Sequence, residues 1–83
     1  MDDEVVFKPS AFNHGVTEAD ILKAIDGYLY DGPMDDDVNK RFLLGFDAKN
    51  NLLEIMYNII NENRINVFHA MKARKVFMAL LDK

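Results

Sequence analysis

The chain changes its hydrophobic pattern within the stretch Arg64-Ile65-Asn66-Val67-Phe68-His69-Ala70-Met71-Lys72-Ala73-Arg74. Apolar and polar side chains alternate at its start, as they do in a half-buried strand. From residue 70 the apolar residues recur at helical spacing, so we expect a helix over residues 70–81. The junction between the strand pattern and the helix pattern brings His69, Lys72 and Arg74 toward one patch. No other part of the sequence gathers as many side chains that can act as acids, bases or phosphate ligands.

The composition indicates one small domain over residues 1–83. With 49% hydrophobic residues the chain can bury a single modest core. The absence of cysteine excludes disulfides and thiolate metal sites. No apolar run approaches the roughly 20 residues of a membrane span, and the acidic start at Asp2, Asp3 and Glu4 differs from a signal peptide. We therefore expect a soluble, cytoplasmic protein with no membrane partner.

The charges are distributed unevenly along the chain. The formal net charge of -4 argues against a nucleic-acid binder as long as the chain is taken whole. Residues 1–37 hold ten acidic and two basic side chains, whereas residues 38–83 hold eight basic and four acidic ones. This asymmetry indicates a surface for an anionic partner on the C-terminal part. A solvated surface of mixed charge explains it equally well.

The N-terminal half predicts a strand, two helices and a loop. Residues 5–8 are typical of a short strand, and Pro9 begins a brief helix that Gly15 ends. Thr17 is a good N-cap for the next helix, which Gly27 closes. Residues 28–39 begin with strand-forming aromatics and become an acidic loop with a Gly-Pro turn. The three aspartates at 35–37 lack the pattern of a calcium loop.

From residue 40 onward, alternating apolar residues predict a β-meander. We expect an α+β fold: a three- to four-stranded antiparallel sheet packed by the N-terminal helices and a C-terminal helix. His69 would then lie beside Ile55. Keeping the apolar sets on one face predicts the pairs Phe46–Leu53, Leu44–Ile55, Phe42–Tyr57, Ile59–Ile65 and Tyr57–Val67. The opposite face would carry a mixed set of side chains: Arg41, Leu43, Glu54, Met56, Asn58, Arg64, Asn66 and Phe68.

The available chemistry favours metal-free catalysis. Two histidines without metal-ligand spacing argue against a transition-metal site, so we expect no cofactor. In metal-free RNA cleavage one group takes the proton of the 2′-hydroxyl, cations stabilise the phosphorane, and an acid protonates the leaving oxygen. His69 can act as acid or base. The cations that can hold phosphate are Arg74, Lys72, Arg41, Arg64 and Lys75.

Each of these residues also has a structural interpretation. His69 can be a hydrogen-bonded structural histidine at a strand end. His14 can cap the carbonyls of the short helix before Gly15. Tyr57 has the parity of a core residue, and Glu54 can be an exposed cross-strand partner of a cation. The sequence leaves these interpretations open beside the catalytic one.

Four short segments resemble the BrnT-like toxins of bacterial toxin–antitoxin pairs, small relatives of the RelE/ParE ribonuclease fold. They cover residues 7–16, 41–45, 51–55 and 67–74. The resemblance implies a cytoplasmic endoribonuclease that binds RNA and is neutralised by a cognate antitoxin protein. Members commonly carry a Ser-Ala-Arg-like run where this chain has His69, Ala70 and Met71, so Arg74 would replace the missing arginine.

A second hypothesis belongs to a different class of function. The chain would be a non-catalytic interaction module that uses the half-apolar face with Leu43, Met56 and Phe68 to bind a partner protein or a second copy. In that case His69 would matter only for stability. Substitutions at His69 and Arg74 separate the two hypotheses from substitutions at Met56 and Phe68.

Overall fold

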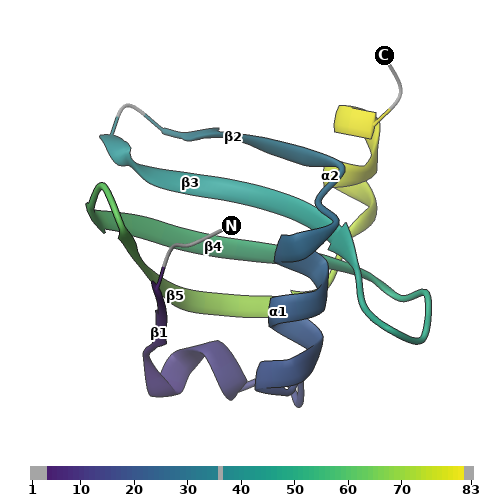
Figure 1. The fold of residues 1–83 in the computed structure, drawn as a ribbon. Coiled ribbons are helices and arrows are strands. Elements are labelled where there is room, and N and C mark those ends of the chain that lie inside the picture. The colour runs from purple at the N-terminus through teal and green to yellow at the C-terminus, as the bar shows by residue number, and fades with distance from the viewer. Residues whose placement is uncertain (1–3, 36, 82–83) are drawn as a thin grey trace.

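Five strands form one mixed sheet in the computed structural model, which describes residues 4–35 and 37–81 (Figure 1). Its order is β1-β5-β4-β3-β2, with β1 parallel to β5 and the other neighbours antiparallel. The α+β class is confirmed. The predicted three- to four-stranded antiparallel sheet is wrong in strand number and in the direction of β1. The strands are β1 (Glu4–Phe7), β2 (Tyr30–Met34), β3 (Asp37–Phe46), β4 (Leu52–Asn61) and β5 (Arg64–Lys72).

The predicted acidic loop is largely sheet. Residues Tyr30–Met34 form an edge strand that pairs with β3, and the register shifts between Pro33 and Met34. Proline is tolerated there because an edge strand has no partner on its outer side. Asp35 turns the chain with a positive φ of 57°. Asp36, like the acidic start at residues 1–3 and the end at 82–83, lies outside the described residues.

The N-terminal helices follow their sequence signals. The 3-10 helix η1 (Pro9–Phe12) begins at Pro9. The helix α1 (Glu18–Asp26) carries a complete capping box between Thr17 and Asp20, and Gly27 is its C-cap. Figure 1 shows α1 crossing in front of the sheet, with the C-terminal helix behind it. None of the helices in the described part of the chain is long and apolar enough to cross a membrane.

The main hydrophobic core lies between α1, η1 and the sheet face that they cover, which we call the inner face. The closest approach is at Gly45, where an added Cβ would overlap the backbone carbonyl of Ala24. Only glycine fits here, and α1 therefore packs directly on β3. The buried residues of this cluster are Ala11, Ile21, Ala24, Ile25, Leu43, Leu53, Ile55, Tyr57, Ile65, Val67 and Ala70.

The predicted register of β3 and β4 is wrong by one residue. Leu43 pairs with Ile55 and Gly45 pairs with Leu53. Leu43 is therefore buried in the core, and its neighbours Phe42 and Leu44 turn to the opposite, outer face. Because residues 42–44 are apolar at both parities, alternation alone could not choose between the two registers. The close approach at Gly45 fits the observed one.

The second hairpin was predicted correctly up to a bulge. Ile59 pairs with Ile65 and Tyr57 pairs with Val67, as expected. The register then shifts, and His69 pairs with Met56 instead of lying beside Ile55. One extra residue, Phe68, sits in β5 at this point, so Phe68 and His69 both project from the outer face. The prediction for His69 was wrong because the alternation of apolar and polar residues in the sequence does not reveal where a strand contains a bulge.

The C-terminal helix is shorter than predicted. β5 continues through Lys72, and helix begins only at α2 (Lys75–Met78), followed by the 3-10 helix η2 (Ala79–Leu81). The pattern at residues 70–72 suits a strand as well as a helix, and pairing with Leu53 to Ile55 decides for the strand. The Phe77 ring of α2 lies 4.5 Å from the Phe42 ring, so α2 covers one end of the outer face.

Candidate functional site

A buried carboxylate organises the covered end of the outer face. Glu54 lies in the middle of β4 and its side chain has 0% exposure. Its Oε1 accepts hydrogen bonds from the Arg74 backbone N–H and from Nε, both at 3.0 Å. Its Oε2 accepts from Arg74 Nη2 at 2.7 Å and contacts His69 Nε2 at 3.0 Å. Four polar contacts therefore converge on one carboxylate.

The ionised carboxylate of Glu54 fixes the tautomer of the neutral His69 ring. Burial on its own raises the pKa of Glu54, but the hydrogen bonds from Arg74 and His69 outweigh it and hold that pKa below its ordinary value. The hydrogen bond to Glu54 raises the pKa of Arg74. Because an ionised carboxylate only accepts, His69 Nε2 must donate, and the neutral imidazole carries its lone pair on Nδ1.

This lone pair faces water. His69 Nδ1 makes no hydrogen bond to the part of the chain that the structure describes, and no buried side-chain nitrogen or oxygen of that part is left without a partner. Nδ1 is therefore in contact with solvent, although the ring as a whole is only 21% exposed. The arrangement presents an oriented imidazole that can accept a proton.

Arg74 reaches Glu54 from the short link between β5 and α2. The Ala73 N–H still bonds to the Leu52 carbonyl at 2.8 Å, and Arg74 follows in an extended conformation as the N-cap residue of α2. Its guanidinium carbon lies 5.1 Å from the centre of the Phe77 ring, a cation–π contact. The side chain remains 52% exposed, so the guanidinium faces both the buried carboxylate and solvent.

A second histidine lies against the first. His14 follows η1, and Gly15 redirects the chain with a φ of 79°. The His14 ring meets the His69 ring edge-on, with 5.5 Å between the ring centres. His14 is exposed. Two neighbouring imidazoles are groups that can serve in general acid–base chemistry.

His14 also borders a polar depression of about 620 Å³ at the end of β5. Lys49 and Lys72 line it together with Asp20 and Asp47. Asp20 accepts hydrogen bonds from Thr17, and Asp47 from Lys49 and Asn51. Burial alone raises the pKa of Asp47, but these hydrogen bonds lower it below its ordinary value. Both carboxylates keep their charge, and Lys49 contributes to the lowered pKa of Asp47, so the depression carries a balanced mixture of charges.

The predicted catalytic residues are thus partly brought together. His69 and Arg74 share Glu54, whereas Lys72 pairs with Leu53 and belongs to the inner face. Lys72 lines the same depression as His14, and this depression is its link to the cluster of Glu54, His69 and Arg74.

The predicted RNA-guiding cations are distributed over the molecule. Arg41 forms a salt bridge with Asp31 on the inner face, with 3.3 Å between Nε and Oδ1. Arg64 forms one with Glu4 at the start of β5, with 2.6 Å between Nη2 and Oε1. Hydrogen bonds to Tyr57 and Asp31 raise the pKa of Arg41 against the opposing effect of burial. Lys75 is exposed at the beginning of α2, close to Arg74 in sequence.

The predicted partner-binding set is divided between the two faces. Met56 and Phe68 are half-buried on the outer face. Leu43 is only 2% exposed and packs in the core. The surface envisaged from Leu43, Met56 and Phe68 therefore does not exist as one patch.

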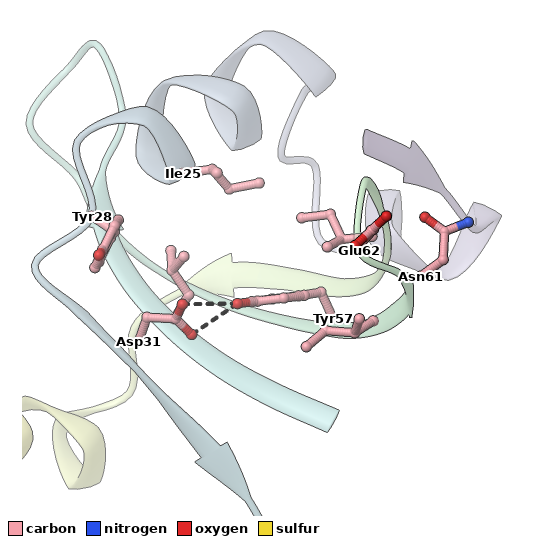
Figure 2. A pocket seen from close by; sticks show the side chains of 9 residues that line it. Ile25, Tyr28, Asp31, Tyr57, Asn61 and Glu62 are labelled. Atoms are coloured by element: carbon pink, nitrogen blue, oxygen red, sulfur yellow. Dashed lines mark hydrogen bonds between the residues drawn. The ribbon is translucent and has the colours of Figure 1, made fainter. Parts of the chain in front are cut away.

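A separate apolar hollow of about 280 Å³ lies beneath the end of α1 (Figure 2). Figure 2 shows Asp31 and Tyr57 pointing toward one another on its wall. The Tyr57 hydroxyl lies 2.9 Å from both Asp31 oxygens. Burial and the hydrogen bond to Asp31 raise the pKa of Tyr57 to about 12. Its other lining residues are Ile25, Tyr28, Leu43, Ile59, Asn61, Glu62 and Ile65.

Comparison with protein-family models, with curated proteins and with solved structures found no match for this chain. Within residues 4–35 and 37–81 no three His, Cys, Asp or Glu side chains are grouped so that they could hold a metal ion. The geometry of the outer face is therefore the basis for assigning a function.

Sequence reasoning identified His69 and Arg74 but gave structural roles to Glu54 and His14. A signal for Glu54 was present, since it stands between apolar neighbours on both sides in the segment Leu52-Leu53-Glu54-Ile55. A carboxylate in such a strand is buried whichever face it occupies, and a buried carboxylate needs a cation. No comparable signal placed His14, because its partner His69 is distant in sequence.

Proposed function

We propose that this protein is a metal-independent endoribonuclease, acting as the toxin of a toxin–antitoxin pair. The observation that carries the proposal is the oriented imidazole of His69, whose Nε2 is held by the buried Glu54 and whose Nδ1 contacts solvent. A cytoplasmic location, a cognate antitoxin partner and a RelE/BrnT-like fold belong to the same proposal. The order of elements, from β1 and η1 through α1 and the meander to α2, supports that fold.

In the proposed reaction His69 Nδ1 takes the proton of a ribose 2′-hydroxyl. The 2′-oxygen attacks the adjacent phosphorus, and the bond from phosphorus to the 5′-oxygen breaks. The products are a 2′,3′-cyclic phosphate and a 5′-hydroxyl, whose proton comes from a protonated His14. The attack needs no added oxidant, reductant or metal.

Charge stabilisation falls to the arginine. Glu54 engages Arg74 Nε and Nη2, and the Arg74 side chain is still 52% exposed. A phosphorane oxygen that binds the exposed edge receives a charge-assisted hydrogen bond from a group that Glu54 has already fixed in place. Lys72 would hold a neighbouring phosphate in the depression beside His14.

The test compares the wild-type chain with His69→Ala and Arg74→Ala, both in a bacterial host and as purified protein with chelator present. We expect growth arrest and RNA cleavage from wild type. His69→Ala should slow cleavage by roughly 100- to 10,000-fold, the usual contribution of general acid–base catalysis. Lys23→Ala on α1 serves as the control. A folded wild-type protein that neither arrests growth nor cleaves RNA would refute the proposal.

A non-catalytic interaction module is the second candidate, and one observation favours it. Met56 and Phe68 remain half-buried on the outer face, where α2 does not fully cover the sheet. Under this candidate Phe68→Asp changes the elution volume of the free protein or its complex. If it does so while His69→Ala leaves RNA and growth effects unaltered, the interaction module is the better account.

A further inference from the structure

We infer that the open part of the outer face is a platform for single-stranded RNA, with one base stacked on Phe68 and the backbone held by Lys8 and Lys40. This inference rests on the proposed function and names the substrate class of the same site. Its physical basis is a shallow hollow that is separate from the buried cluster. Its lining residues are Lys8, Ser10, Lys40, Asn58 and Phe68.

The aromatic ring is placed by the bulge in β5. Because Phe68 is the extra residue, it projects from the outer face beside His69 and does not enter the core. The Ser10 hydroxyl donates to the Phe68 carbonyl at 2.7 Å and anchors the bulged backbone to η1. The half-buried ring therefore has a fixed position and an open side.

A polar group suited to a base edge lies next to the ring. Asn66 Nδ2 donates to Asn58 Oδ1 at 3.0 Å across the strands. This leaves Asn58 Nδ2 as a donor and Asn66 Oδ1 as an acceptor with no hydrogen bond to a described residue. Asn66 is only 8% exposed and does not line the hollow, whereas Asn58 does. The free Nδ2 of Asn58 is therefore the group beside the ring that can donate to the edge of an unpaired base.

The positive charges of the lysines around the hollow favour binding of a polyanion. Lys8 and Lys40 flank it, and both are exposed. No carboxylate lines it among the residues that the structure describes. An RNA backbone therefore meets cations on both sides of the Phe68 ring.

The platform leads directly to the proposed catalytic group. Phe68 and His69 are consecutive and share the outer face, so a base on Phe68 places its ribose and the adjoining phosphodiester toward His69 Nδ1. A duplex cannot use the platform, because paired bases hide both faces in the stack. The inferred substrate is accordingly an unpaired segment.

The first experiment measures binding of a fluorescent 2′-O-methyl oligouridine, which lacks the attacking hydroxyl and stays intact. We expect Phe68→Leu to weaken binding by about five- to 100-fold, the usual loss of one base–aromatic stack, and Phe68→Tyr to preserve it. Tyr28→Leu, in the link between α1 and β2, is the matched control. Duplex RNA should bind more weakly than the single strand.

A second measurement does not depend on the Phe68 variants. Lys8→Gln and Lys40→Gln should each reduce the slope of log affinity against log salt by about 0.7, whereas Lys23→Gln should leave it unchanged. Unchanged slopes, or equal binding of duplex and single strand, would overturn the inference.

The outcomes separate the platform from catalysis. If wild type cleaves RNA and Phe68→Leu binds and cleaves as wild type does, the platform is refuted and the nuclease stands. If the oligouridine binds through Phe68 while natural RNA stays intact, the nuclease is refuted and the platform stands. If Phe68→Leu alters only the sedimentation of the free protein, the face joins two copies and the platform is refuted.

Discussion

Glu54 holds three groups that lie 15 to 20 residues away from it in the chain. Its carboxylate fixes the tautomer of His69, the guanidinium of Arg74 and the backbone where α2 begins. A buried charge of this kind is stable only while its donors are present. Changes at Glu54 should therefore affect stability and the reactive state of His69 together.

Glu54→Gln should lower the free energy of unfolding at neutral pH by about 1–3 kcal/mol, since charged hydrogen bonds are replaced by weaker ones. The folded-state pKa of Glu54 lies below its ordinary value of 4.5. Its contribution is therefore fully present above pH 4.5 and is lost as the pH falls through the folded-state pKa. Denaturant titrations from neutral to acidic pH should show a smaller acid-dependent loss in Glu54→Gln.

The exposed Glu62 in the β4–β5 turn provides the control for this experiment. Glu62→Gln should leave both the neutral-pH stability and its acid dependence close to wild type. An acid profile of Glu54→Gln that overlays wild type would show that the carboxylate does not stabilise the fold in its ionised form.

Tyr57 supplies a test at the opposite end of the pH scale. Its pKa of about 12 means that the folded state holds the phenol proton more tightly than the unfolded state, for which 10.0 is the ordinary value. The resulting stabilisation is fully present below pH 10.0 and is lost as the pH rises through about 12. The tyrosinate absorbance of wild type minus that of Tyr57→Phe should titrate near 12.

Circular dichroism must confirm that both proteins remain folded over the titrated range. A difference titration centred near the ordinary value would mean that the hydrogen bond to Asp31 does not form.

The contact between Tyr57 and Asp31 was only partly predictable from the sequence, because Tyr57 was correctly assigned to the core while its partner Asp31 was assigned to a loop.

At the scale of elements, the contact of α1 with β3 depends on Gly45. A methyl group there would overlap the Ala24 carbonyl, and backbone cannot move aside as a flexible side chain does. Gly45→Ala should lower the free energy of unfolding by about 1–3 kcal/mol or more, as overpacking does. Gly27→Ala is the matched control, since no atom lies within 4 Å of its added Cβ. Equal stability of the two variants in denaturant titrations would contradict the close packing.

The elements that sequence predicted best have local causes. The capping box of Thr17 and Asp20, the Gly27 stop and the second hairpin follow from residues close together in the chain. The elements it missed depend on distant partners. The run Phe42-Leu43-Leu44 takes its register from α1, and residues 70–72 become strand because β4 pairs with them.

The candidate site was predictable to the same extent. The clustering of His69 and Arg74 came from their closeness in sequence, whereas the bulge at Phe68 and the burial of Glu54 arise from strand pairing. A one-residue shift moves every side chain to the other face, so an error in register also divided the predicted surface of Leu43, Met56 and Phe68.

At the scale of the whole molecule, the open sheet has two edges, and β2 protects one of them. Pro33 has no N–H to offer another strand, and the register shift beside it distorts the edge further. Pro33→Thr should therefore increase self-association with concentration, measured by sedimentation equilibrium. Lys75→Thr on α2 controls for surface substitution as such. Identical association of the wild type and Pro33→Thr would show that the proline does not protect this edge.

The parallel pairing of β1 with β5 has a consequence for the order of folding. Val5 lies opposite Ile65, so this contact closes a loop that contains most of the domain. The hairpins of β3, β4 and β5 close much shorter loops and can form first. During synthesis β1 leaves the ribosome before β5, with which it pairs. The apolar strand β1 thus stays unpaired until β5 has been made, a period in which chaperones can bind it.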